Sequence, residues 1–163
     1  MSRSSLFAAS AALLISGAAS AADLPAAIQV KGETVVFQAH GVGAQIYECR
    51  GDASGKLTWQ FREPIATLIR DGKTVGRHYA GPSWQVGVSE VKGKLNATSP
   101  APNPKDIPWL KLSIDDPTDD GELEGVTTVQ RINTSGGVAA GTCDKPGDFH
   151  AEPYAADYLF LKK

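Results

Sequence analysis

The sequence lacks a strong net charge, a membrane-length apolar run and an internal repeat. Its 16 basic and 18 acidic side chains give a formal net charge of −2. This weak acidity provides no electrostatic basis for binding nucleic acid or an anionic lipid surface. Every apolar run ends before the roughly 20 residues that a membrane-spanning helix needs. We therefore expect a protein that does not bind nucleic acid and does not span a membrane.

The N-terminus has the parts of a secretory signal peptide in the right order. Arg3 supplies a short positive region, residues 6–15 are apolar, and small residues follow at positions 19–22. This order is typical of a leader that is cleaved on export, although a buried N-terminal helix is the alternative. We predict a signal peptide over residues 1–22, a single β domain over residues 23–163, and a periplasmic or secreted location.

Only two cysteines occur, Cys49 and Cys143. An even number of cysteines in an exported chain indicates a disulfide. The bond would close a loop of about 95 residues and contribute roughly 4–5 kcal/mol in the chain-entropy account of disulfides. Two free thiols, available as metal ligands, are the alternative.

Short stretches rich in β-branched and aromatic residues alternate with turn residues, and no long stretch has helical period. Asp71-Gly72 is typical of a hairpin turn, whereas Pro64 leaves a short helix over residues 65–70 as an alternative. Residues 99–106 contain three prolines and predict an extended crossing loop. Expected strands cover residues 34–37, 45–50, 56–61, 65–70, 74–79, 83–88, 91–98, 109–114, 126–132 and 154–161. Their spacing predicts an all-β fold, an antiparallel β-barrel or β-sandwich with one disulfide.

Seven aromatic side chains could either line a cavity or form an ordinary core. We expect Trp59 and Trp109, which alternate with polar neighbours, to lie in the core. On the last expected strand one face is shared by four residues, Tyr154, Ala156, Tyr158 and Phe160. The seven are Tyr47, Trp59, Tyr79, Trp84, Trp109, Tyr154 and Tyr158.

The densest group of chemically capable residues surrounds a Gly-Pro bend between two expected strands. It contains His78, Tyr79, Ser83 and Trp84, which we take as the candidate ligand-binding residues. His78 could act as a general base near neutral pH or as a metal ligand. The alternative is a packed corner in which His78 bonds to the backbone and the aromatic rings fill the core. A serine triad is disfavoured because Ser83 lacks the G-x-S-x-G context that exposes a nucleophile.

Metal-binding signals are weak. The three histidines, His40, His78 and His150, show no spacing typical of a metal site. The acidic loop around Asp116, Asp120 and Glu122 has most of the oxygen pattern of a calcium loop. It lacks the final bidentate Glu and flanking helices, so a solvated acidic turn is the alternative. We expect no bound metal and no cofactor.

Six stretches in order carry a resemblance to a known family: GAQIYEC at residues 43–49, WQF at 59–61, GRHYAGPSW at 76–84, IPWL at 107–110, VTTVQR at 126–131 and PYAADY at 153–158. Together they resemble an uncharacterised family of exported bacterial and fungal proteins, classified as a domain of unknown function. The resemblance implies export, one domain and pairing of Cys49 with Cys143, but no catalytic residues.

Some fungal members of that family carry a malate dehydrogenase label. A dinucleotide site requires G-x-G-x-x-G between a strand and a helix. Here Gly41-Val42-Gly43 continues to Ile46, so the third glycine is absent and a strand is expected to follow. We therefore expect no dehydrogenase.

The leading functional hypothesis is a non-enzymatic extracytoplasmic binding module for a small molecule or an envelope component. Its basis is an aromatic-rich bend in a chain without a complete catalytic constellation. Two alternatives remain: a hydrolase or metal-dependent enzyme that uses His78, and a structural or interaction protein of the cell envelope.

Overall fold

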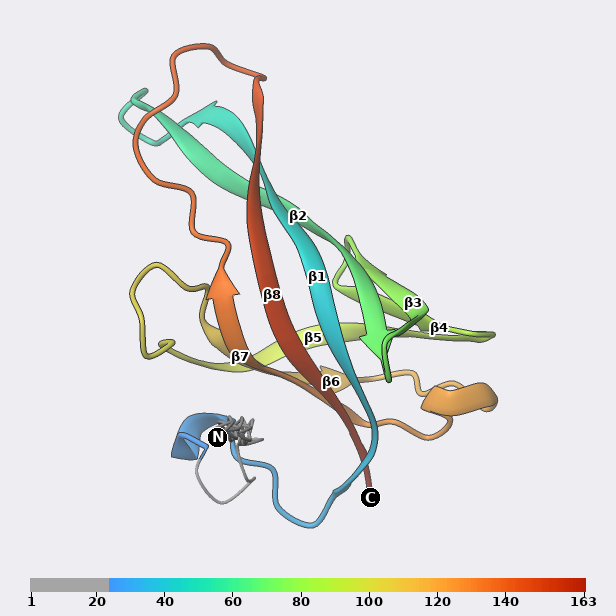
Figure 1. Cartoon of the computed structure of the whole chain (residues 1–163). Helices are drawn as coiled ribbons and strands as arrows, with labels where there is room; N and C mark the ends of the chain where they lie inside the picture. The colour runs from blue at the N-terminus through green and yellow to red at the C-terminus, as the bar shows by residue number, and fades with distance from the viewer. Residues whose placement is uncertain (1–23) are drawn as a thin grey trace, which may run out of the picture.

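Eight antiparallel strands form a closed ring in which the last strand pairs with the first (Figure 1). The computed structural model describes residues 24–163, and the signal peptide predicted for residues 1–22 lies outside them. The strands are β1 (Thr34–Gly51), β2 (Leu57–Arg70), β3 (Lys73–Tyr79), β4 (Ser83–Val86), β5 (Ser89–Ser99), β6 (Trp109–Ile114), β7 (Thr128–Gly136) and β8 (Phe149–Lys162), with short 3-10 helices η2 (Ala26–Ile28) and η3 (Gly121–Leu123). The predicted all-β antiparallel fold is confirmed, and it is a barrel.

No helix within residues 24–163 is long and apolar enough to cross a membrane.

The first two strands are longer than the sequence predicts, because glycine and proline do not interrupt them. Gly41 faces the barrel interior, where a Cβ atom would lie 2.6 Å from Cε2 of Tyr158. The glycine therefore makes room for a core aromatic ring and does not form a turn. Pro64 lies within β2 opposite Gln45 of β1. The helix considered for residues 65–70 is wrong, since these residues belong to β2.

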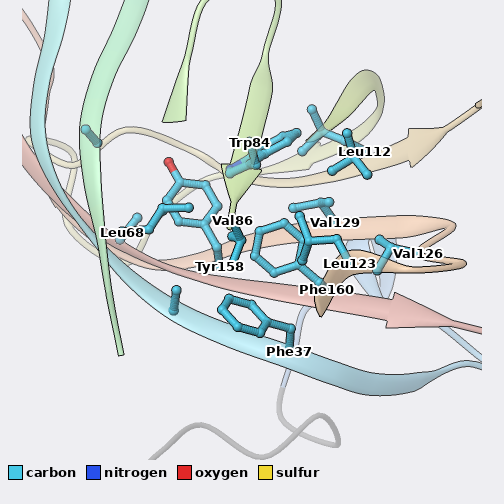
Figure 2. Packing of buried hydrophobic residues seen from close by; sticks show 14 of the residues in the cluster. Phe37, Leu68, Trp84, Val86, Leu112, Leu123, Val126, Val129, Tyr158 and Phe160 are labelled. Atoms are coloured by element: carbon cyan, nitrogen blue, oxygen red, sulfur yellow. The ribbon is translucent and has the colours of Figure 1, made fainter. Parts of the chain in front are cut away.

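A column of aromatic rings fills one half of the barrel (Figure 2). The ring of Phe160 lies 5.6 Å from that of Phe37 and 6.1 Å from that of Trp84, with edge-to-face geometry in both pairs. Tyr158 adjoins Trp84 at 5.8 Å. Edge-to-face packing of this kind adds to the free energy gained from burying the rings. The predicted shared face of β8 is confirmed, because Tyr154, Ala156, Tyr158 and Phe160 all belong to the interior cluster, whereas Leu159 and Leu161 belong to a separate one.

The acidic loop between β6 and β7 closes this half of the barrel. Leu123 of η3 and Val126 are fully buried, and Figure 2 shows both beside Phe160. Ser89 holds the loop in place: its hydroxyl donates to the main-chain oxygen of Asp120 at 2.6 Å and accepts from the N–H of Leu123 at 3.2 Å. The loop thus presents carboxylates to solvent and apolar side chains to the core.

The segment that precedes β1 packs on the outside of the barrel. Leu24 and Ile28 are buried against Ile132 of β7 and Leu159 of β8. The side-chain amide of Gln130 donates to the main-chain oxygen of Ile28 at 2.6 Å. This cover explains why β7 is buried on both of its faces.

The predicted disulfide is confirmed. Cys49 and Cys143 are joined, with their Cα atoms 5.8 Å apart, and neither thiol is free. The bond attaches the connection between β7 and β8 to the end of β1. Two main-chain hydrogen bonds support it, from the Cys49 N–H to the Asp148 oxygen at 2.8 Å and from the Gly147 N–H to the Cys49 oxygen at 2.9 Å.

Because the loop between β6 and β7 buries Leu123 at the closed end of the barrel, shortening this side chain should lower the stability of the fold. Leu123→Ala should lower the free energy of unfolding by about 2–4 kcal/mol, because it leaves a cavity beneath the loop. Val88→Ala is the matched control, since Val88 is 77% exposed and should change stability by less than about 0.5 kcal/mol. Urea denaturation measures both. Equal, small losses would show that the loop is not part of the core.

The disulfide predicts a second effect on stability. The double variant Cys49→Ala/Cys143→Ala should lose about 4 kcal/mol, because the bond links residues separated by 94 positions and restricts the unfolded chain. Urea denaturation of the wild type with and without reductant provides the control. Reductant should reproduce the loss in the wild type and leave the double variant unchanged. A double variant as stable as the oxidised wild type would contradict the prediction.

Candidate functional site

The half of the barrel opposite η3 contains a pocket of about 290 Å³. Every strand except β1 contributes to its lining, and the turn between β3 and β4 adds two residues. Most of the lining is apolar. The lining residues are Phe61, Arg62, Pro64, His78, Gly81, Pro82, Trp84, Leu95, Leu110, Leu112, Arg131 and Tyr158.

A β-bulge in β2 shapes the entrance to the pocket. Glu63 pairs with Ile46 and Phe61 pairs with Tyr47, so Arg62 is an extra residue in β2. Because side chains alternate between faces with a period of two, the extra residue lets Phe61 line the same interior as Pro64. Phe61 and Arg62 are both largely exposed, and they form the solvent side of the pocket.

His78 and Trp84 form the inner wall on one side. They lie opposite each other on β3 and β4, and their rings stack with centroids 4.6 Å apart and planes 8° from parallel. Nδ1 of His78 lies 2.8 Å from the main-chain oxygen of Ser83. Since a carbonyl only accepts, Nδ1 carries the proton and Nε2 of the neutral ring is an acceptor.

Burial lowers the pKa of His78 to about 4, against the opposing effect of the Ser83 carbonyl, and the charge of Arg131 lowers it further. His78 is therefore neutral at pH 7. A general base works best with a pKa near the working pH, so this environment suits a hydrogen-bonding wall residue better than a base.

Arg131 lies on the opposite wall, where it pairs with Leu110 of β6 and Tyr158 of β8. It is only 9% exposed. Its Nε and Nη2 atoms donate to the main-chain oxygen of Pro108 at 3.3 and 2.8 Å. Burial lowers the pKa of Arg131, and the nearby Tyr158 and Tyr154 hydroxyls oppose this. A guanidinium nevertheless keeps its charge in proteins. Among residues 24–163 no carboxylate forms an ion pair with Arg131.

Two further polar groups are buried between these walls. The hydroxyls of Tyr158 and Tyr154 lie 3.0 Å apart, and burial raises the pKa of both. Figure 2 shows that the Tyr158 hydroxyl points away from Phe37 and Phe160, so it faces the half of the interior that holds the pocket. The indole nitrogen of Trp84 is buried and has no hydrogen-bond partner within the described part of the chain.

The structure brings together two of the four ligand-binding candidates. His78 and Trp84 line the pocket, whereas Tyr79 and Ser83 do not. Strand alternation places Tyr79 on the outer face, where the guanidinium of Arg77 lies 4.9 Å from the centre of its ring. Ser83 contacts His78 through its main-chain oxygen and not through its hydroxyl.

The cation candidates have other partners. Glu122 pairs with Arg70 at 3.2 Å, and the carboxylate of Asp120 accepts from the Thr118 hydroxyl at 3.1 Å. Asp116 is exposed. Across residues 24–163 no group of three or more His, Cys, Asp or Glu side chains is arranged to hold a metal ion.

The remaining histidines lie apart from the pocket. His40 pairs with Asp157 and His150 pairs with Glu152, each at 2.8 Å. The expectation that Trp59 and Trp109 are core residues is wrong, because both are only half-buried. Trp59 contacts the ring of His150 at 5.3 Å, and Trp109 packs on the outer cluster formed with the N-terminal segment.

The pocket contains two arginines, Arg62 and Arg131, that the sequence did not single out. Arg131 shares its face of β7 with the buried Val129. A charged residue at a position that alternation predicts to be buried is the sequence signal by which Arg131 could have been found.

The chain belongs to a protein family of unknown function, DUF3455, whose model matches residues 30–162. This confirms the resemblance to an uncharacterised family. No curated protein and no solved structure matches the chain.

The buried histidine predicts a pH dependence of stability. The unfolded chain takes up a proton near pH 6.5 and the folded chain only near pH 4, so stability falls as the pH decreases between these values. Between pH 7 and pH 4.5 the free energy of unfolding of the wild type should fall by roughly 2 kcal/mol more than that of His78→Gln.

Urea denaturation of both proteins across this pH range measures the effect. His40→Gln is the control for losing one histidine, because His40 is exposed. Parallel pH profiles for the wild type and His78→Gln would contradict the prediction.

Proposed function

We propose that the protein is an exported, non-enzymatic binding module and that the pocket inside the barrel receives a small molecule. The observation that carries the proposal is an interior cavity with a mostly apolar lining into which a few polar groups converge. Small-molecule sites commonly have this composition. An eight-stranded barrel is also about the size that can enclose one small ligand.

The volume supports a small ligand and not a polymer. At about 290 Å³ the pocket is close to the lower limit of the range for small-molecule sites, roughly 300–1,000 Å³. The solvent side, formed by Phe61, Arg62 and Leu95, gives such a ligand a way in. Leu95 is 58% exposed although it lines the pocket, so its side chain stands at the entrance.

Export is part of the proposal. The order of charge, apolar run and small residues at the N-terminus supports it, and a disulfide suits an oxidising compartment. A periplasmic or secreted binding protein would meet its ligand outside the cytoplasm.

The geometry favours binding over hydrolysis. His78 directs its protonated nitrogen to a main-chain carbonyl, and no hydrogen bond links its ring to a carboxylate within residues 24–163. The histidine of a Ser-His-Asp triad needs both a carboxylate partner and a serine hydroxyl.

Blocking the entrance should abolish binding without loss of the fold. A ligand found by thermal-shift screening should stabilise the wild type by about 2.7 kcal/mol at roughly 100 times its Kd. It should not stabilise Leu95→Trp, in which the larger side chain fills the entrance. Val88→Trp is the matched control, because Val88 is exposed and does not line the pocket.

The same thermal-shift measurement decides between the outcomes. Stabilisation of the wild type and Val88→Trp, but not of Leu95→Trp, supports the site. Equal stabilisation of all three proteins would place the ligand elsewhere.

A further inference from the structure

We propose that the ligand is a small amphipathic monoanion, such as a carboxylic acid with an apolar body, whose charged group lies against Arg131. This inference rests on the proposed binding function and adds the chemical class of the ligand. Its basis is that two buried groups line the same pocket, and neither finds its partner among residues 24–163: the Arg131 cation has no carboxylate and the Trp84 N–H has no acceptor.

The first observation is the state of the Arg131 side chain. A buried charge is costly unless it is paired, and proteins normally provide the partner. Here the Pro108 carbonyl takes two of the five N–H donors of the guanidinium. The neighbouring Tyr154 and Tyr158 are neutral phenols. A carboxylate bound from solvent would supply the missing charge, and its two oxygens match the planar guanidinium.

The second observation is independent of the charge. Trp84 is 1% exposed and lines the pocket, yet its indole N–H has no partner within the described part of the chain. An indole nitrogen only donates, so the group that completes it must be an acceptor. Buried polar atoms in folded proteins are nearly always hydrogen-bonded, and an exception indicates a missing partner. An anionic oxygen is the strongest acceptor available.

The lining as a whole agrees with an anion. Its charged residues are Arg62 and Arg131, and none of the twelve lining residues is acidic. Apolar walls of low dielectric focus the field of such charges into the cavity. A single negative charge on the ligand is favoured, because one positively charged side chain, Arg131, lies deep in the lining. Arg62, the other, stands at the solvent side.

The rest of the lining specifies the body of the ligand. Most of the other lining residues have apolar side chains, among them Leu110, Leu112, Leu95, Pro64 and Phe61. A ligand whose body is an alkyl chain or one or two aromatic rings would bury its apolar surface against these side chains, while its charged end lies against Arg131.

The test compares acids with uncharged molecules of the same shape. Isothermal titration calorimetry near pH 7 measures hexanoate against hexanamide and 2-naphthoate against 2-naphthamide, on the full mature protein. We expect each acid to bind at least about tenfold more tightly than its amide, which corresponds to one charge-assisted hydrogen bond. Arg131→Met should remove this preference and retain weak binding of the amides. Arg77→Met, on the outer face, should keep it.

The outcomes separate the two proposals. Equal affinities of acid and amide for the wild type, or no binding of either acid at millimolar concentration, would overturn the monoanion and leave the binding function to the screen described above. A preference for the acids that persists in Arg131→Met would overturn the role of Arg131. The acid–amide comparison on the wild type requires no variant, so it remains decisive if Arg131→Met fails to fold.

Discussion

Closure of the eight strands into a ring forces every second side chain of each strand into one narrow interior. In an open sheet these side chains could face solvent, whereas here they must fill the space or leave a cavity. The protein does both. Large rings and the end cap of Leu123 and Val126 fill one half, and the other half keeps a pocket. Where the interior is too crowded, glycine replaces a side chain, as at Gly41 beneath the ring of Tyr158.

The boundary between the two halves passes through Tyr158 and Trp84. Their rings pack on apolar neighbours, and both residues also line the pocket, where each carries one polar atom: the Tyr158 hydroxyl and the Trp84 indole N–H. Aromatic residues with a polar atom suit such a boundary, because one end is apolar and the other needs a partner. The same arrangement keeps His78 neutral, since stacking on Trp84 shields its ring from water.

The sequence predicted the class of fold, the disulfide and most strands because these depend on local alternation and composition. The strand at residues 109–114 agrees with β6, and the Asp71-Gly72 turn joins β2 to β3. Local pattern could not show that Gly41 and Pro64 lie inside long strands, because both normally end strands. In each case the reason is a contact with a distant residue, Tyr158 for the glycine and the opposite strand for the proline.

The candidate site was only partly predictable for the same reason. His78 and Trp84 stood out because they flank a bend, but Tyr79 and Ser83 flank it too and alternation turns them away from the pocket. Alternation with Val129 marks Arg131 as a charged residue on an inward face, but only the fold places it across the barrel from His78 and shows that no carboxylate of residues 24–163 pairs with it. The acidic loop suggested a cation site, whereas its structural role depends on the apolar Leu123 and Val126.

The barrel is open beside a buried cation, and anomalous scattering from a crystal soaked in iodide is the sharpest test of that arrangement. We expect an iodide peak inside the barrel, in contact with the guanidinium of Arg131 and near the indole nitrogen of Trp84. An interior filled by side chains, with a carboxylate of the protein paired to Arg131 and no peak in the barrel, would contradict it.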